Sequence, residues 1–246
     1  MHMNPTHQRI GLWVTLAGMI LGGIGLVACA RFLPPPSPDM TAEQVVQLYQ
    51  TDTNLKRLGF VLMMLGNGFY FGIVAVISVQ MKRIEGVGRM LNYTQLATGA
   101  VNALLLLLPS VFFTAAAFRP ERSPDVTVAL HDIGWFLAVM PVASFMFQQF
   151  VIALAIFADK APQPLFPRWV AYMNIWTATL YLPAFMDTFF KTGPFAWNGL
   201  LAFWIPALIF GLIWIPVMLV FLFKAIRREE HEAAPTAVRV GVRQAA

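Results

Sequence analysis

The sequence predicts an all-α fold: a polytopic bundle of six transmembrane helices with both termini in the cytoplasm. Three observations predict it. The 246 residues are 58% hydrophobic and only 12% charged, with a mean hydropathy of +0.66, whereas soluble domains carry about 25% charged residues. Six apolar stretches approach or exceed the roughly 20 residues that a membrane-spanning helix needs. Because backbone amides cannot stay unpaired in lipid, such long spans are expected to be helical.

The predicted spans cover about residues 10–30, 58–81, 91–118, 131–158, 169–190 and 197–223. Residues 1–230 are therefore expected to form one transmembrane domain. Prolines inside the spans predict kinks, at Pro109, Pro141, Pro183, Pro206 and Pro216. The stretch 231–246 is polar with scattered Ala and Val, and it is expected to be a disordered cytoplasmic tail.

The orientation follows from the distribution of basic residues between the two sets of loops. With the N-terminus inside, eleven of the 17 Lys and Arg residues fall in cytoplasmic segments, as the positive-inside rule requires. The net charge of +5 is then explained by topology, and no nucleic-acid partner is expected. The chain is expected to lie in the bacterial inner membrane.

The longest predicted outside loop begins with residues 34–38 (PPPSP), which favour a stiff extended connector. Thr41 and Gln44 then match a capping box at the start of a helix. Val45, Leu48 and Tyr49 follow at helical spacing, which predicts a short amphipathic helix at the membrane interface. Two interpretations stay open for this helix: a lid over an external opening, or a packed elbow.

The single cysteine, Cys29, excludes an internal disulfide and a cysteine-based metal centre. Residues 26–29 (LVAC) also match a lipoprotein cleavage motif. The apolar stretch before Cys29 is near 20 residues, however, longer than the roughly 7–15 residues of a signal core. The favoured interpretation is a first membrane helix that ends near Cys29, with lipidation left open.

Asp132 and Asp187 are the only carboxylates inside the predicted spans, and both lie near the same membrane face. A charge at such depth usually faces a protein interior or a cavity and has a partner. With His131 and Lys191 they form a candidate cluster for gating, cation binding or proton exchange, and Asp132, Asp187 and His131 are the candidate catalytic residues. The structural alternative is an Asp187–Lys191 salt bridge, with Asp132 capping the start of its helix.

A second set of polar side chains lies deeper in the spans. Such groups either join helices through hydrogen bonds or line a substrate cavity. The candidate ligand-binding residues are Asn67, Tyr70, Asn102, Gln148, Asn174, Tyr181 and Lys191.

Several chemistries are excluded by what the spans lack. Only His131 among the four histidines lies near a span, so a bis-histidine haem site is not expected. No phosphate-cradling Gly-Lys-Ser/Thr motif occurs, which argues against an ATPase. We expect no cofactor and no metal ion.

Residues 34–38 (PPPSP), 41–44 (TAEQ), 166–169 (FPRW) and 191–198 (KTGPFAWN) resemble an uncharacterised family of bacterial multi-pass, six-helix membrane proteins. The resemblance covers most of the chain. It implies a membrane protein and brings no activity with it, since these motifs lie in loops and at interfaces.

Three functional hypotheses follow. The first is a protein that binds or passes a small apolar molecule through an outward-opening cavity. The second is a membrane-embedded enzyme that performs acid–base chemistry on a lipophilic substrate, with Asp132 or Asp187 as proton donor and His131 or Tyr181 assisting. The third is a non-catalytic assembly subunit. The expected partners are membrane lipids, a small hydrophobic ligand, and further copies of the chain or neighbouring membrane subunits.

Overall fold

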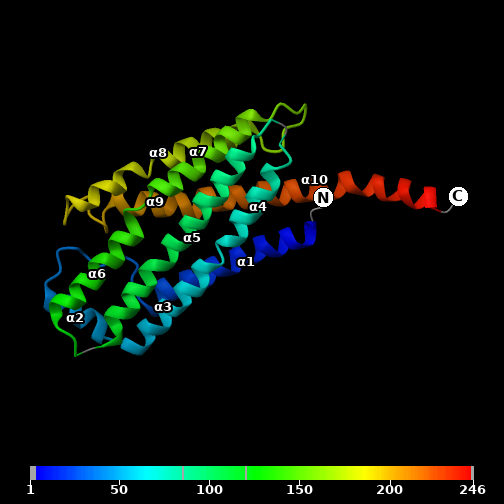
Figure 1. Cartoon of the computed structure of the whole chain (residues 1–246). Coiled ribbons are helices and arrows are strands. Elements are labelled where there is room, and N and C mark those ends of the chain that lie inside the picture. The colour runs from blue at the N-terminus through cyan, green and yellow to red at the C-terminus, as the bar shows by residue number, and fades with distance from the viewer. Residues whose placement is uncertain (1–3, 85, 120, 245–246) are drawn as a thin grey trace.

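The computed structural model describes residues 4–84, 86–119 and 121–244, with side chains as far as residue 232. Within these ranges the chain forms helices and no strand, which confirms the all-α prediction. Figure 1 shows an elongated bundle in which the long helices run side by side along one axis.

The first half of the chain contributes three long rods and one short helix. α1 (Pro5–Ile24) continues as a π-helical turn, η1 (Gly25–Cys29). The short α2 (Ala42–Gln50) precedes α3 (Thr53–Gly68), which is followed after a two-residue break by α4 (Phe71–Met81). α5 (Arg89–Phe118) is unbroken although it contains Pro109.

The second half is more interrupted. α6 (Pro124–Val139) and α7 (Ala143–Ala158) are separated at Pro141, and α8 (Arg168–Thr179) leads into the 3₁₀ helix η2 (Leu182–Thr188). The last rod consists of η3 (Leu200–Trp204), α9 (Ile205–Leu208), η4 (Ile209–Trp214) and α10 (Ile215–Gln244).

Five helical rods are long and apolar enough to cross a membrane. They are Pro5–Cys29, Thr53–Met81, Arg89–Phe118, Pro124–Ala158 and Leu200–Glu232. Each of them also exposes large apolar side chains, for example Trp13, Leu65, Leu104, Leu154 and Leu212. Such surfaces suit lipid better than water, so the chain is a multi-pass membrane protein.

The predicted span 169–190 takes a different form from a single α-helix. The α-helical part is only 12 residues long, and it continues after a turn at Leu180 and Tyr181 as the seven-residue η2. Pro183 in the first turn of η2 lacks an N–H group, so it cannot extend the α-helical hydrogen-bond ladder of α8.

The segment after Glu230 is helical backbone as far as Gln244, where composition predicts disorder. Near its start, Glu232 pairs with Arg83, in the turn after α4, and with Arg228. Glu230 also pairs with Arg9 of α1. These contacts tie the beginning of the predicted tail to the bundle.

Close glycine contacts set the position of α1 against α3 and α4. A methyl group at Gly18 would lie 2.5 Å from the carbonyl oxygen of Gly66, and one at Gly25 would lie 2.5 Å from that of Gly59. The helix backbones therefore touch directly, as small residues permit in membrane helix pairs.

The short helix predicted after the proline-rich connector is confirmed. Thr41 and Gln44 form the complete capping box, and α2 starts at the next residue, Ala42. Val45 and Tyr49 on its inner face are buried. These contacts agree with the packed-elbow interpretation of α2.

Candidate functional site

Four of the helical rods are interrupted near one another, and an apolar cavity lies among the interruptions. The rod of α3 and α4 breaks at Phe69 and Tyr70, α6 ends before Pro141, α8 ends at Thr179, and the last rod is π-helical on both sides of α9. In membrane proteins irregular backbone is tolerated where it is buried in protein or lines a cavity. The interruptions therefore mark this level of the bundle as the candidate site.

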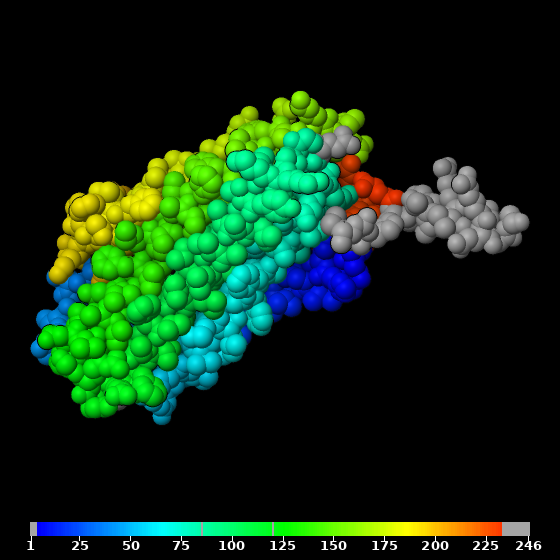
Figure 2. All heavy atoms as spheres, in the orientation of Figure 1, coloured from blue at the N-terminus to red at the C-terminus, as the bar shows by residue number. Residues whose placement is uncertain are grey.

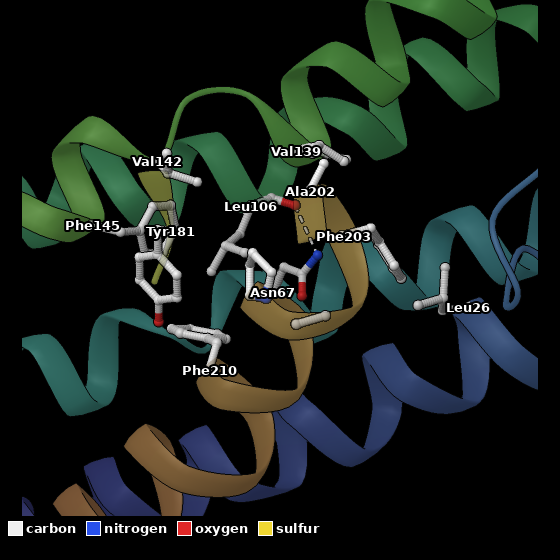
Figure 3. A pocket seen from close by; sticks show the side chains of 13 residues that line it. Leu26, Asn67, Leu106, Val139, Val142, Phe145, Tyr181, Ala202, Phe203 and Phe210 are labelled. Carbon is white, nitrogen blue, oxygen red and sulfur yellow. Dashed lines mark hydrogen bonds between the residues drawn. The ribbon is translucent and has the colours of Figure 1, made fainter. Parts of the chain in front are cut away.

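The cavity has a volume of about 310 Å³. Figure 3 shows its walls, which come from helices far apart in the sequence. Its polar lining residues are Asn67 and Tyr181, and its apolar ones are Leu26, Leu106, Ala138, Val139, Val142, Phe145, Ala202, Phe203, Pro206, Ala207 and Phe210.

The break between α3 and α4 has a cause that lies in another helix. The Thr15 hydroxyl of α1 donates to the carbonyl oxygen of Phe69 at 3.0 Å and accepts from the Ile73 N–H at 2.9 Å. In an unbroken helix Phe69 and Ile73 would bond to each other. Thr15 therefore stands between the two groups and satisfies both of them.

A second, smaller cavity of about 130 Å³ adjoins the first. Asn67, Leu106 and Phe210 line both cavities and separate them. Tyr70 lines only the second one.

Two free hydrogen-bonding functions remain on the polar wall of the larger cavity. The Tyr181 hydroxyl accepts a hydrogen bond from Gln149 Nε2 at 3.1 Å, and its own hydrogen has no acceptor among the described residues. Asn67 Nδ2 donates to the Leu106 carbonyl at 2.8 Å, as the dashed line in Figure 3 shows. Within the same described part of the chain, Asn67 Oδ1 receives no hydrogen bond.

Behind this wall, Gln148 connects three helices. Its Oε1 accepts hydrogen bonds from the Tyr70 hydroxyl at 3.3 Å and from Asn102 Nδ2 at 2.7 Å. Asn102 Oδ1 in turn accepts from Ser144. Gln148 and Asn102 are buried and line neither cavity. They hold in place the break between α3 and α4, where Tyr70 lies.

Asn174 and Lys191 lie away from the cavities. Asn174 Oδ1 accepts from Trp214 Nε1 at 2.9 Å, and its Nδ2 donates to the Val170 carbonyl. It thereby joins α8 to η4. Lys191 is exposed in the turn that follows η2. The structure thus brings Asn67, Tyr70 and Tyr181 to cavity walls, and it leaves the other four candidates outside them.

The acidic candidates and His131 occupy a different part of the bundle. His131 is 1% exposed, and its Nδ1 lies 3.0 Å from the Tyr49 hydroxyl. The rings of Phe32, Phe113, Trp135 and Trp197 surround it. Its Nε2 has no hydrogen-bond partner within the described residues.

Asp187 is 4% exposed, and neither carboxylate oxygen completes a hydrogen bond within the described ranges, although the Thr188 N–H lies beside it. Asp132 is half-buried on α6 and close enough to Lys191 to attract it. His131, Asp132 and Asp187 line neither of the two cavities.

Both parts of the structural alternative for these acids are wrong. Asp187 forms no ion pair with Lys191 in the described structure, because η2 ends at Thr188 and Lys191 lies beyond it, outside any helix. Asp132 does not cap a helix, because α6 begins at Pro124 and Asp132 lies two turns inside it.

The aromatic walls of the cavity, Phe145, Phe203 and Phe210, are not singled out by the sequence. Phenylalanines in apolar spans carry no signal that separates a cavity wall from a lipid-facing position. Trp197 is buried near the same end of the bundle as His131 and donates from Nε1 to the Pro36 carbonyl.

No group of three or more His, Cys, Asp or Glu side chains that could hold a metal ion occurs within the described ranges. Comparison with models of known protein families, with curated proteins and with solved structures finds no match for this chain.

Proposed function

We propose that the chain crosses the bacterial inner membrane six times, with both termini in the cytoplasm. Gln8 and Arg9 near the start of α1 bond to Glu229 and Glu230 of α10. Both ends of the transmembrane domain thus lie at one end of the bundle (Figure 1), which requires an even number of crossings. α8 and η2 together span about 30 Å, enough for the sixth.

We infer that the protein binds a small apolar molecule that carries a hydroxyl group. The observation that carries this inference is the apolar cavity with a free donor on Tyr181 and a free acceptor on Asn67. Its volume of about 310 Å³ lies at the lower end of the range for ligand sites. A ligand hydroxyl can accept a hydrogen bond from Tyr181 or donate one to Asn67.

The position of the cavity favours an outward opening. Leu26 lies near the end of its rod, and Ala202 and Phe203 lie near the start of theirs. In the proposed topology these are the outer ends of both spans. Ala207, another lining residue, is exposed on the bundle surface, which gives the cavity a contact with the lipid phase as well.

Binding is favoured over acid–base catalysis because Asp132, Asp187 and His131 do not line the cavity. A catalytic acid has to reach the proton that it transfers. An assembly role for the whole chain is the second candidate, and the Gln148 and Asn174 hydrogen bonds that join helices favour it.

The test compares 1-decanol with n-decane as probes for the purified protein in nanodiscs, with thermal stabilisation as the measure of apparent affinity. We expect decanol to bind roughly threefold to tenfold more tightly than decane, since one neutral hydrogen bond has about this value. Tyr181→Phe is expected to remove the preference and keep decane binding. Tyr172→Phe, an exposed tyrosine away from the cavity, is the matched control.

Equal affinity for the two probes in the wild-type protein would overturn the hydroxyl assignment. Ala202→Trp, at a lining residue that is buried, places a large side chain in the cavity and is expected to abolish binding of both probes. If both probes still bind to this variant, they bind elsewhere and the cavity is not the site.

A further inference from the structure

A third cavity of about 240 Å³ lies at the end of the bundle where α4 ends and α5 begins. It is lined by Met81, Lys82, Val87, Arg89, Asn92 and Tyr93. Among the residues that the structure describes, which leave out position 85 of this loop, no Asp or Glu belongs to this lining. It is separate from the apolar cavity and shares no lining residue with it.

Lys82 and Arg89 are unpaired cations within the described structure, where no hydrogen bond or ion pair is formed by either side chain. Two other basic residues at this end do have acidic partners: Arg9 pairs with Glu230, and Arg83 pairs with Glu232. Two unpaired positive charges on one cavity wall favour an anionic ligand, since no described residue of the lining neutralises them.

The depth of this cavity matches that of phospholipid headgroups. It lies between the end of one apolar rod, Met81, and the start of the next, Arg89. Met90 is 76% exposed and Tyr93 is 62% exposed just inside α5. Tyrosine at such a position is typical of the membrane–water interface, so lipid acyl chains can lie against these two side chains.

The walls of the cavity suit a phosphate group. An arginine guanidinium binds phosphate oxygens in a bidentate manner, and a lysine adds a point charge. Asn92 is fixed by Ser78, whose hydroxyl donates to Asn92 Oδ1 at 3.0 Å and whose carbonyl accepts from Asn92 Nδ2. The N-terminus of α5 has Gly88 as its cap and no side-chain hydrogen bond there, which adds a favourable dipole.

We propose that this cavity binds the phosphate of an anionic phospholipid, with Lys82 and Arg89 as its ligands. The chemistry that it recognises is a phosphate with a negative charge at the membrane surface. Free inorganic phosphate offers the same group without acyl chains, so the experiment has to separate the two sources.

The experiment is native mass spectrometry of the full-length protein, titrated with phosphatidylglycerol, phosphatidylcholine or inorganic phosphate. We expect the first phosphatidylglycerol to bind at least about tenfold more tightly than phosphatidylcholine. Lys82→Gln with Arg89→Gln should weaken phosphatidylglycerol binding about tenfold and leave phosphatidylcholine unchanged.

The matched control removes two other unpaired basic residues, with Lys160→Gln and Arg168→Gln, and it should change binding less than twofold. Arg89→Lys keeps the charge and should retain most of the affinity even if the double variant folds poorly. The proposal is overturned if the two double variants behave alike. Displacement of phosphatidylglycerol by millimolar inorganic phosphate would overturn the assignment to lipid.

Discussion

Tyr49 and His131 form a polar pair inside an otherwise aromatic cluster. Their side chains are 3.0 Å apart, and Phe32 lies against both rings. Tyr49 belongs to α2 and His131 to α6, so this one hydrogen bond fixes the short helix on the bundle. Loss of either partner leaves a buried polar atom unsatisfied, which costs more than the hydrogen bond itself contributes.

Tyr49→Phe is therefore expected to lower the free energy of unfolding by about 1–3 kcal/mol. Tyr172→Phe serves as the control, because Tyr172 is exposed and such surface changes stay within about 0.5 kcal/mol. Thermal or denaturant unfolding in detergent measures both. Equal stability of the two variants would show that the Tyr49–His131 pair does not hold α2 in place.

The same hydroxyl predicts a pH dependence. Burial, and secondly the charge of Asp132, raises the pKa of Tyr49 well above its usual value of 10.0. The folded state then holds this proton more tightly than the unfolded state. The contribution of this proton to the stability of the folded state is complete below pH 10 and is lost as the pH rises above 10. We expect the wild type to lose more stability than Tyr49→Phe between pH 10 and pH 11.

At the level of helices, Thr15 of α1 contributes to the break between α3 and α4, which contains no proline. Residues 66–72 contain no proline, and the hydroxyl that separates Phe69 from Ile73 comes from α1. A side chain inserted in this way is a known cause of helix kinks. The break thus depends on the packing of α1 in addition to the low helix propensity of Gly66, Gly68 and Gly72.

Thr15→Val keeps the shape of the side chain and removes the hydroxyl. We expect a loss of about 1–3 kcal/mol in stability and faster hydrogen exchange at the Ile73 amide. Thr94→Val is the control, because the Thr94 hydroxyl bonds only to the Met90 carbonyl on the surface of α5. Unchanged exchange at Ile73 would mean that the segment closes into a regular helix without Thr15.

Two glycines of α1 offer an internal comparison. A methyl group at Gly18 would lie 2.5 Å from both the Gly66 carbonyl oxygen and Phe69 Cβ, whereas one at Gly23 would meet nothing within 4 Å. Gly18→Ala should cost about 1–3 kcal/mol through overpacking. Gly23→Ala should stabilise by about 0.5–1 kcal/mol through helix propensity. A shift of the thermal unfolding midpoint in the same direction for both variants would contradict the packing of α1.

Local signals predicted the elements whose causes are local. The capping box of Thr41 and Gln44 located α2 to the residue, and Pro141 marked the end of α6. The break at Phe69 and Tyr70 was not predictable, because its cause is 54 positions away in the sequence. The 3₁₀ form of η2 and the burial of Trp197 also depend on tertiary packing.

The candidate site was predictable only in part, for the same reason. Polarity in an apolar span singled out Asn67 and Tyr181, which line the main cavity, and equally Asn174, which joins two helices. The sequence gives the polarity of a side chain, but it does not tell whether that face of the helix lies against a cavity or against another helix.

For the whole molecule, the proposed topology predicts which loops are accessible from outside. Single cysteines would be placed at Thr6, Ser37, Gln163 and Thr192 in a Cys29→Ala background. In intact cells, an impermeant maleimide should label positions 37 and 192 but not positions 6 and 163. All four should react after lysis. Labelling of positions 163 and 192 from the same side would contradict a crossing by α8 and η2.

The charged end of the bundle gives this topology its structural basis. Gln80 Nε2 donates to Gln8 at 2.6 Å and to Glu229 at 3.0 Å, which joins α4, α1 and α10 at one point. Figure 2 shows the described residues of α10, in red, at this same end of the molecule. The helices α1, α4 and α10 are thus joined by hydrogen bonds at this end, while the apolar cavity lies farther along the bundle.

The wall between the two apolar cavities has a consequence for selectivity. Phe210 is part of it, and its ring packs against Tyr70, Phe145 and Trp214. Rotation of this ring would join both spaces into one longer chamber, at a cost of about 0.5–1.5 kcal/mol for each of these aromatic pairs that it separates. The length of an accepted chain then depends on the rotamers of the three side chains in this wall, Asn67, Leu106 and Phe210, and it can change without any movement of the helices.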